Sequence, residues 1–165
     1  MKPYALSARL KDGEKNAGAP APVRRGGFIH VNVAQDSRVL RARRGYLLFG
    51  WLFIACILVQ VFLAGVGTFV SPIHFAKHVG FVHIFEYLPL LMLVLAFAGR
   101  LSPKLRWMTA GLFALIAVQY MTADARHYGV ALGRFIAALH PVTAMGLFWA
   151  AIVTLRQARR EIGDG

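Results

Sequence analysis

Cysteine and acidic residues are scarce in this chain. The one cysteine, Cys56, excludes a disulfide within the chain, and no Cys-x-x-Cys-His segment is available for covalent attachment of a cofactor. Aspartate and glutamate number 7, against 19 lysines and arginines. A Ser-His-Asp order, a phosphate-binding loop and the Cys/His spacing of a zinc site are also absent. The sequence therefore shows no motif typical of a soluble enzyme.

Apolar sequence is abundant instead. Hydrophobic residues make up 58% of the 165 residues and the mean hydropathy is +0.55, more than the interior of a soluble protein of this size can bury. Most of it lies in four runs, at 46–70, 79–99, 107–123 and 135–155. At about 1.5 Å per helical residue, each run approaches the roughly 30 Å of a bilayer core. We predict an all-α integral membrane four-helix bundle with spans at about 46–70, 78–99, 106–123 and 134–156.

The basic residues predict the orientation, because lysine and arginine are retained on the cytoplasmic side of short loops. Sixteen of the nineteen lie before the first run, between the second and third, or after the fourth. The opposite connections hold only Lys77, Arg126 and Arg134. Both termini are thus predicted to be cytoplasmic. This distribution accounts for the net charge of +12 without a nucleic-acid partner, and the basic tail can hold anionic lipid headgroups.

The first 44 residues differ in composition from the rest. Glycine, alanine, proline and lysine are frequent before residue 28, and no apolar core suggests a cleaved signal peptide. Only 28–34 alternates like a strand, and we interpret it as unstructured rather than as a partner for a sheet edge. We expect a mostly flexible cytoplasmic tail at 1–44, the bundle at 45–157, and a second cytoplasmic tail at 158–165.

The candidate chemical groups gather at one end of the runs, opposite most of the basic residues: His74, His78, His83, His127, His140 and Glu86. Ionisable groups within spans usually face a partner or a cavity. Two basic residues, Arg100 and Arg156, end the second and fourth spans. His83 lies 17 residues before Arg100, and His140 lies 16 residues before Arg156. We therefore predict that His83 and His140 lie at matched height, with His78 about five residues nearer the outer surface.

Two neutral imidazoles on opposite sides of an iron are what a six-coordinate b-type heme needs. We predict a non-covalent heme b between His83 and His140, with His78 as the substitute ligand, for electron transfer within the membrane. Arg126 and Arg134 lie on the correct side to pair with the heme propionates. The alternative, and the commoner fate of membrane histidines, is a hydrogen bond to a neighbouring helix or to interfacial water.

Glutamate and proline interrupt the apolar runs. Glu86 follows His83 closely enough to hydrogen-bond an imidazole, and it can handle protons or form a neutral interhelical hydrogen bond to Gln60 or Gln119. Pro89 and Pro141 each remove a backbone donor, and they predict kinks that widen the outer half of the bundle.

The two halves of the chain show a weak similarity to each other. Gln60 is followed by His83, and Gln119 by His140, at nearly equal spacing, which indicates two related helix pairs. Another frame aligns His74 with His140, because each precedes a glycine by the same interval. The depth count disfavours that frame, because His74 lies outside the apolar run.

This order of glutamine and histidine spans, with LHPVTA at 139–144, resembles an uncharacterised bacterial family of small four-helix membrane proteins. The pattern also resembles one half of heme A synthase, whose four-helix halves carry histidines on their second and fourth helices. The resemblance covers 46–156 and implies a bacterial inner-membrane protein with heme between His83 and His140. The chain departs from the synthase in having one half only and a glutamate that follows the span-two histidine. We therefore do not extend the reaction of the synthase, oxidation of a heme methyl group, to this chain.

Two other functions stay open. One is a cofactor-free structural or assembly subunit of a larger membrane complex, and the other is a proton or small-solute conduit that uses Glu86 and the histidines. Side-chain acid–base catalysis is disfavoured, because the spans hold no second carboxylate. Any redox chemistry would come from the bound heme.

Overall fold

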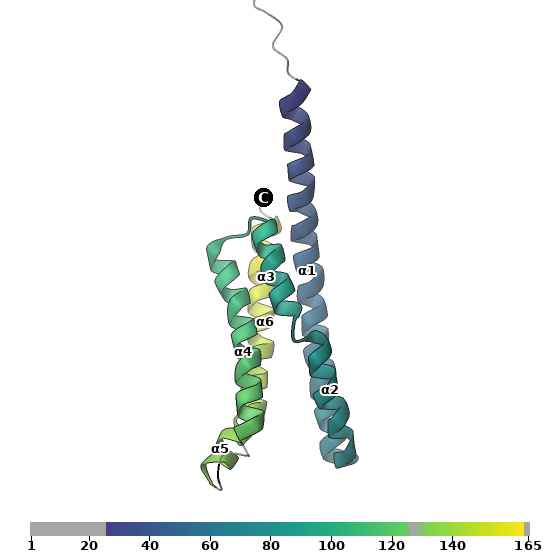
Figure 1. The fold of residues 1–165 in the computed structure, drawn as a ribbon, viewed down its shortest axis with the longest axis vertical. Helices are drawn as coiled ribbons and strands as arrows, with labels where there is room; N and C mark the ends of the chain where they lie inside the picture. Colours follow the sequence, from purple (N-terminus) through teal and green to yellow (C-terminus); the bar gives the residue numbers. More distant parts are fainter. Residues whose placement is uncertain (1–25, 126–128, 130, 164–165) are drawn as a thin grey trace, which may run out of the picture.

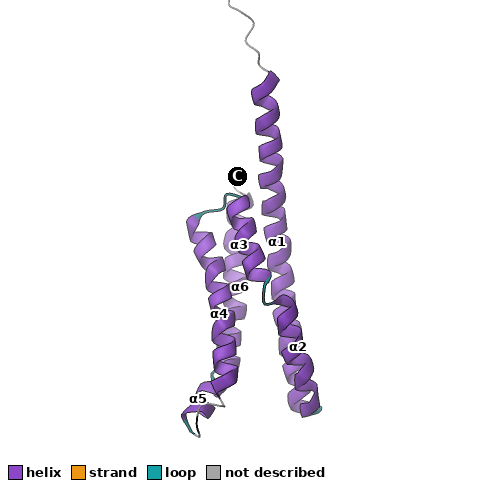
Figure 2. Ribbon diagram, in the orientation of Figure 1, coloured by secondary structure: helices purple, strands orange, loops and turns teal. Residues whose placement is uncertain are grey.

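The computed structural model describes residues 26–125, 129 and 131–163. Within this part of the chain every regular element is helical and no strand occurs, which confirms the predicted all-α class (Figure 2). The elements are α1 (Gly26–Phe69), the 3₁₀ turn η1 (Pro72–His74), α2 (Phe75–Phe85), α3 (Leu88–Ala98), α4 (Pro103–Asp124), α5 (Leu132–Ala138) and α6 (His140–Gly163).

Among the described residues, three helical segments are long and apolar enough to cross a membrane: Asp36–Phe69, Pro72–Ala98 and Leu132–Gly163. They contain three of the four predicted spans and support a membrane protein. The remaining predicted span lies in α4, whose 22 residues cover about 33 Å by helical rise. Polar residues near its end, Gln119 and Tyr120 among them, make it less apolar than the other three. It packs against α3 and α6 as part of the same bundle.

Helix α1 is longer than the sequence predicted. It begins at Gly26, so residues 26–44 are helical, and the flexible tail predicted for 1–44 is corrected over this part. The strand-like alternation of 28–34 also falls inside the helix. No glycine or proline occurs at 28–44, and extending a formed helix costs far less than starting one. Residues 1–25 of the predicted tail lie outside the described residues.

The bundle has two unlike ends (Figure 1). The end where α3 connects to α4 and α6 finishes is called here the basic end, and the end with η1 and α5 is called the histidine end. Helix α1 packs on α2, α3 and α6, and α4 packs on α3, α5 and α6. Toward the histidine end, the α1–α2 pair diverges from α4 and α6, and α1 projects beyond the basic end (Figure 1).

Spans two and four are each broken at a proline. Helix α2 ends at Phe85, and α3 begins at Leu88 with Pro89 in its first turn. Helix α5 ends at Ala138, and α6 begins at His140 next to Pro141. Proline has no N–H to donate to the preceding turn, and its ring clashes with that turn. Each predicted interruption is therefore present, as one or two residues between consecutive helices.

Polar contacts stabilise the basic end. The buried Tyr46 hydroxyl and Thr109 Oγ1 lie 2.6 Å apart and join α1 to α4. The Ser102 hydroxyl donates to Glu161 Oε2 over 2.8 Å, and the Ser102 N–H donates to the other oxygen of the same carboxylate. Arg43 Nε donates to the Gly99 carbonyl over 3.0 Å. Glu161, near the end of α6, therefore lies beside the α3–α4 connection.

We expect Glu161→Ala to lower the free energy of unfolding by about 2 kcal/mol, because it removes two hydrogen bonds to a charged acceptor. Equilibrium unfolding in mixed detergent micelles measures the change. Asp36→Ala, which removes the same charge from an exposed position, is the control and leaves the unfolding curve in place. Equal stability of the two variants would contradict this role for Glu161.

Candidate functional site

Two histidines from opposite sides of the bundle meet near the histidine end. His78 lies on α2 and His140 is the first residue of α6, and their ring centroids are 6.4 Å apart with planes inclined by 74°. We call these two residues the histidine pair. The sequence predicted His83 as the first partner of His140 and His78 as the substitute. The structure brings His78 to His140.

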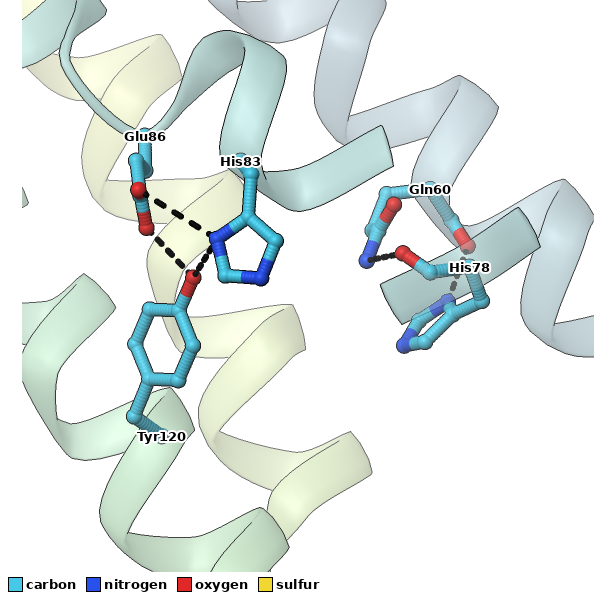
Figure 3. Close-up of polar contacts among 5 residues, drawn as sticks. All are labelled: Gln60, His78, His83, Glu86 and Tyr120. Atoms are coloured by element: carbon cyan, nitrogen blue, oxygen red, sulfur yellow. Dashed lines mark hydrogen bonds and ion pairs between the residues drawn. The ribbon is translucent and has the colours of Figure 1, made fainter. Parts of the chain in front are cut away.

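The ring of His78 is oriented by Gln60 of α1 (Figure 3). His78 Nδ1 lies 3.0 Å from the Gln60 carbonyl, and Gln60 Nε2 donates to the His78 carbonyl over 2.9 Å. A carbonyl only accepts hydrogen bonds, so Nδ1 carries the hydrogen. In a neutral imidazole the other nitrogen, Nε2, is then unprotonated and free to act as a ligand or an acceptor.

His140 is held in the same way by α4. Its Nδ1 lies 3.1 Å from the Gln119 carbonyl and 3.1 Å from Thr122 Oγ1. The Thr122 hydroxyl donates back to its own helix, so its oxygen accepts from the ring. Gln119 Nε2 donates to Thr143 Oγ1 on α6 over 2.7 Å, which fixes the two helices at this level. The tautomer of His140 is therefore that of His78, with Nε2 unprotonated.

The similarity between the two halves of the chain is also seen in the contacts of the two histidines. In each half, the backbone carbonyl of a glutamine on the first helix accepts from Nδ1 of a histidine on the second: Gln60 with His78, and Gln119 with His140. The sequence paired Gln60 with His83 instead. The side chains of both glutamines form interhelical hydrogen bonds as predicted, but to the His78 carbonyl and to Thr143, not to Glu86.

The residue count that predicted His83 assumed that Arg100 and Arg156 lie at the same height. Helix α6 continues past Arg156 to Gly163, and it is Glu161 that lies level with Ser102. Counted back from this contact, His140 lies 21 residues before Glu161, whereas His83 and His78 lie 19 and 24 residues before Ser102. The count therefore favours neither residue, and the ring contact alone places His78 beside His140.

A second polar group surrounds Glu86 in the break between α2 and α3 (Figure 3). We call His83, Glu86 and Tyr120 the Glu86 cluster. The Tyr120 hydroxyl of α4 donates to Glu86 Oε2, and His83 Nδ1 lies 3.4 Å from Glu86 Oε1 and 3.2 Å from the Tyr120 oxygen. The ring of His83 stacks on Tyr120 with centroids 6.1 Å apart and planes inclined by 24°. The predicted contact between Glu86 and an imidazole is confirmed.

Tyr120 was missed by the sequence analysis. A carboxyl group in an apolar span requires a donor from a neighbouring helix, and Tyr120 directly follows a glutamine that had been singled out. The need of Glu86 for such a donor could have identified Tyr120 from the sequence.

The other candidate residues lie apart from the histidine pair or outside the described chain. His74 is half-buried in η1, and Arg134 is exposed on α5. Arg126, predicted as a propionate partner, and His127 lie outside the described residues. In the described part of the chain, no group of three or more histidine, cysteine, aspartate or glutamate residues is arranged to hold a metal ion.

The chain matches a family of unknown function (DUF6220) over residues 60–126. It resembles an uncharacterised family, as the sequence predicted. The matched segment begins at Gln60 and contains His78 and the whole Glu86 cluster, while His140 lies beyond it. No curated protein and no solved structure matches the chain. The resemblance to heme A synthase stays a prediction.

Both rings of the histidine pair are held in the same way. Both imidazoles are fixed through Nδ1 by hydrogen bonds to backbone carbonyls, the usual outer partner of a metal-binding histidine. Two imidazoles that bind one metal from opposite sides, with bonds of about 2 Å, have ring centres about 6 Å apart. The separation of 6.4 Å between the rings of His78 and His140 agrees with this value.

Proposed function

We propose that this membrane protein holds one heme b between His78 and His140 and serves in electron transfer within the membrane. The observation that supports the proposal best is the histidine pair itself. Two rings from opposite helices lie 6.4 Å apart, and each is oriented by a hydrogen bond from Nδ1 to a backbone carbonyl. Neutral imidazoles with a free nitrogen are the form that binds heme iron.

The surroundings of the pair fit a bound group. Gln60 and Gln119 orient the two rings, and a hydrogen bond from Nδ1 to a carbonyl makes the opposite nitrogen a stronger ligand. We further propose Arg134 and Arg126 as partners of the propionates.

When bound by two histidines, heme carries one electron through the ferric and ferrous states of its iron. The protein's own contribution is to orient both imidazoles through their Nδ1 hydrogen bonds. The α4–α6 hydrogen bond between Gln119 and Thr143 keeps His140 at the height of His78.

The test is a reduced-minus-oxidised absorption spectrum of the protein purified in detergent from heme-replete cells. We expect the sharp bands of a six-coordinate b-type heme at about one heme per chain. A colourless protein would overturn the proposal. That outcome would favour the cofactor-free alternatives, an assembly subunit or a proton conduit. A partner that co-purifies in stoichiometric amount would then support the subunit, and proton flux in vesicles that Glu86→Gln abolishes would support the conduit.

We also propose that the basic end faces the cytoplasm of a bacterial cell, with both termini inside. The exposed basic residues on this end can contact anionic headgroups, each contributing about 1 kcal/mol near such a surface. They are Arg38, Arg41, Arg44, Arg100, Lys104, Arg156, Arg159 and Arg160.

Cysteine labelling tests this orientation, because the one native cysteine is easily removed. In a Cys56→Ala background, Ile73→Cys places a thiol at the histidine end and Lys104→Cys places one at the basic end, both at exposed positions. We expect a membrane-impermeant maleimide to label position 73 in spheroplasts and position 104 only after the membrane is permeabilised. The reverse pattern would contradict the proposed orientation.

A further inference from the structure

The Glu86 cluster presents one polar side chain to the outside of the bundle. The side chain of His83 is 57% exposed, whereas that of Glu86 is 15% exposed. Its neighbours Ile84 and Tyr87 are also exposed. All of them lie in Pro72–Ala98, one of the segments long and apolar enough to cross a membrane. The exposed edge of His83 is therefore open on a segment that is able to lie in the bilayer.

The hydrogen bonds within the cluster determine what that edge offers. The Tyr120 hydroxyl gives its hydrogen to Glu86 Oε2, so its oxygen and Glu86 Oε1 are both acceptors toward His83 Nδ1. Nδ1 therefore carries the hydrogen, and Nε2 of the neutral ring is an unprotonated acceptor. Hydrocarbon tails supply no donor, and an unsatisfied polar group in the membrane is costly. The site therefore favours a membrane-soluble molecule with a hydroxyl group.

The aromatic surroundings narrow the class of molecule. His83 is stacked on Tyr120, and Tyr87 is exposed on the next turn. Aromatic rings in stacked or edge-on contact gain stability beyond that of the area they bury. A hydroquinone combines a flat ring, a hydroxyl donor and solubility in the bilayer. The oxidised quinone has carbonyl groups only and cannot donate to Nε2.

We propose that the Glu86 cluster is a binding site for a lipid-soluble hydroquinone, which enters from the bilayer and donates a hydroxyl hydrogen bond to His83 Nε2. The site lies on the α2–α3 break and α4, apart from the histidine pair. The proposal concerns binding alone and does not rest on the presence of heme.

The experiment uses the full chain in lipid nanodiscs, with ¹⁵N-labelled histidine and dithionite present to keep the probe reduced. The probe is a decyl-substituted benzohydroquinone, and its O,O-dimethyl ether is the matched compound without donors. We expect the hydroquinone to shift the Nε2 resonance of His83 in a saturable way. The dimethyl ether and dodecanol are expected to bind at least about tenfold more weakly, because each lacks either the donor or the ring. Equal binding of the dimethyl ether, or no shift at His83, would overturn the proposal.

Variants give a second readout. His83→Phe keeps an aromatic ring without the acceptor, and we expect its affinity for the hydroquinone to fall about tenfold. His74→Phe is the matched control, since it makes the same change in η1 outside the cluster and should leave the affinity unchanged. Equal affinity of His83→Phe and the unmodified protein would contradict the assignment. The readout is a histidine resonance and not a heme band, so failure of this proposal is distinguishable from failure of the heme proposal.

Discussion

The His78→Ala and His140→Ala proteins are each expected to purify with little or no heme, whereas the unmodified chain is expected to carry about one per molecule. Because the chain has no site for a thioether attachment, a bound heme would be held by its bonds to the two histidines. Loss of a residue that only orients a metal ligand typically costs about 10–100-fold in affinity, and loss of the ligand itself should cost more. Heme content by the pyridine hemochrome assay, divided by protein concentration, measures the effect.

The matched control for these variants is His83→Ala. His83 lies in the same helix α2 as His78, but its described contacts are to Glu86 and Tyr120. We expect it to keep its heme. Circular dichroism and elution volume show whether each variant has folded. Heme that persists in folded His78→Ala and is lost in His83→Ala would show that the original ligand prediction, His83 with His140, was right and the pairing proposed here wrong.

The all-helical architecture was predictable from the sequence, because a long apolar segment has few other ways to satisfy its backbone hydrogen bonds in lipid. The extension of α1 to Gly26 was not predictable in the same way. Residues 28–44 are polar enough to be soluble, and their helical state depends on continuation from the first span rather than on their own composition. The breaks at Pro89 and Pro141 were located from the sequence, because the missing N–H is a local property.

The site was predicted in its residue types and only partly in its pairing. Two glutamines and two histidines at similar spacing indicated related halves, and a glutamine–histidine contact exists in each half of the structure. The choice between His78 and His83 depends on the contact between their rings and His140, which a residue count along the helices does not determine. The Ser102–Glu161 contact lies beyond Arg156 on the fourth span. A contact between segments so distant in the sequence cannot be predicted from a local sequence pattern. The role of Tyr120 is of the same kind, because it depends on how α4 faces the α2–α3 break.

Replacing one proposed ligand by a weaker one should change the redox potential without emptying the site. In His78→Met the thioether takes the place of the imidazole, and histidine–methionine ligation raises the potential of a heme relative to two histidines. We expect a rise on the order of 100 mV, within the roughly 0.8 V that axial ligands span. A potentiometric titration followed in the visible spectrum measures it. His83→Met, the same substitution further along α2, should leave the potential unchanged. A residue that only packs against heme would not produce this difference, so equal potentials in the two variants would exclude His78 as a ligand even if both proteins were fully loaded.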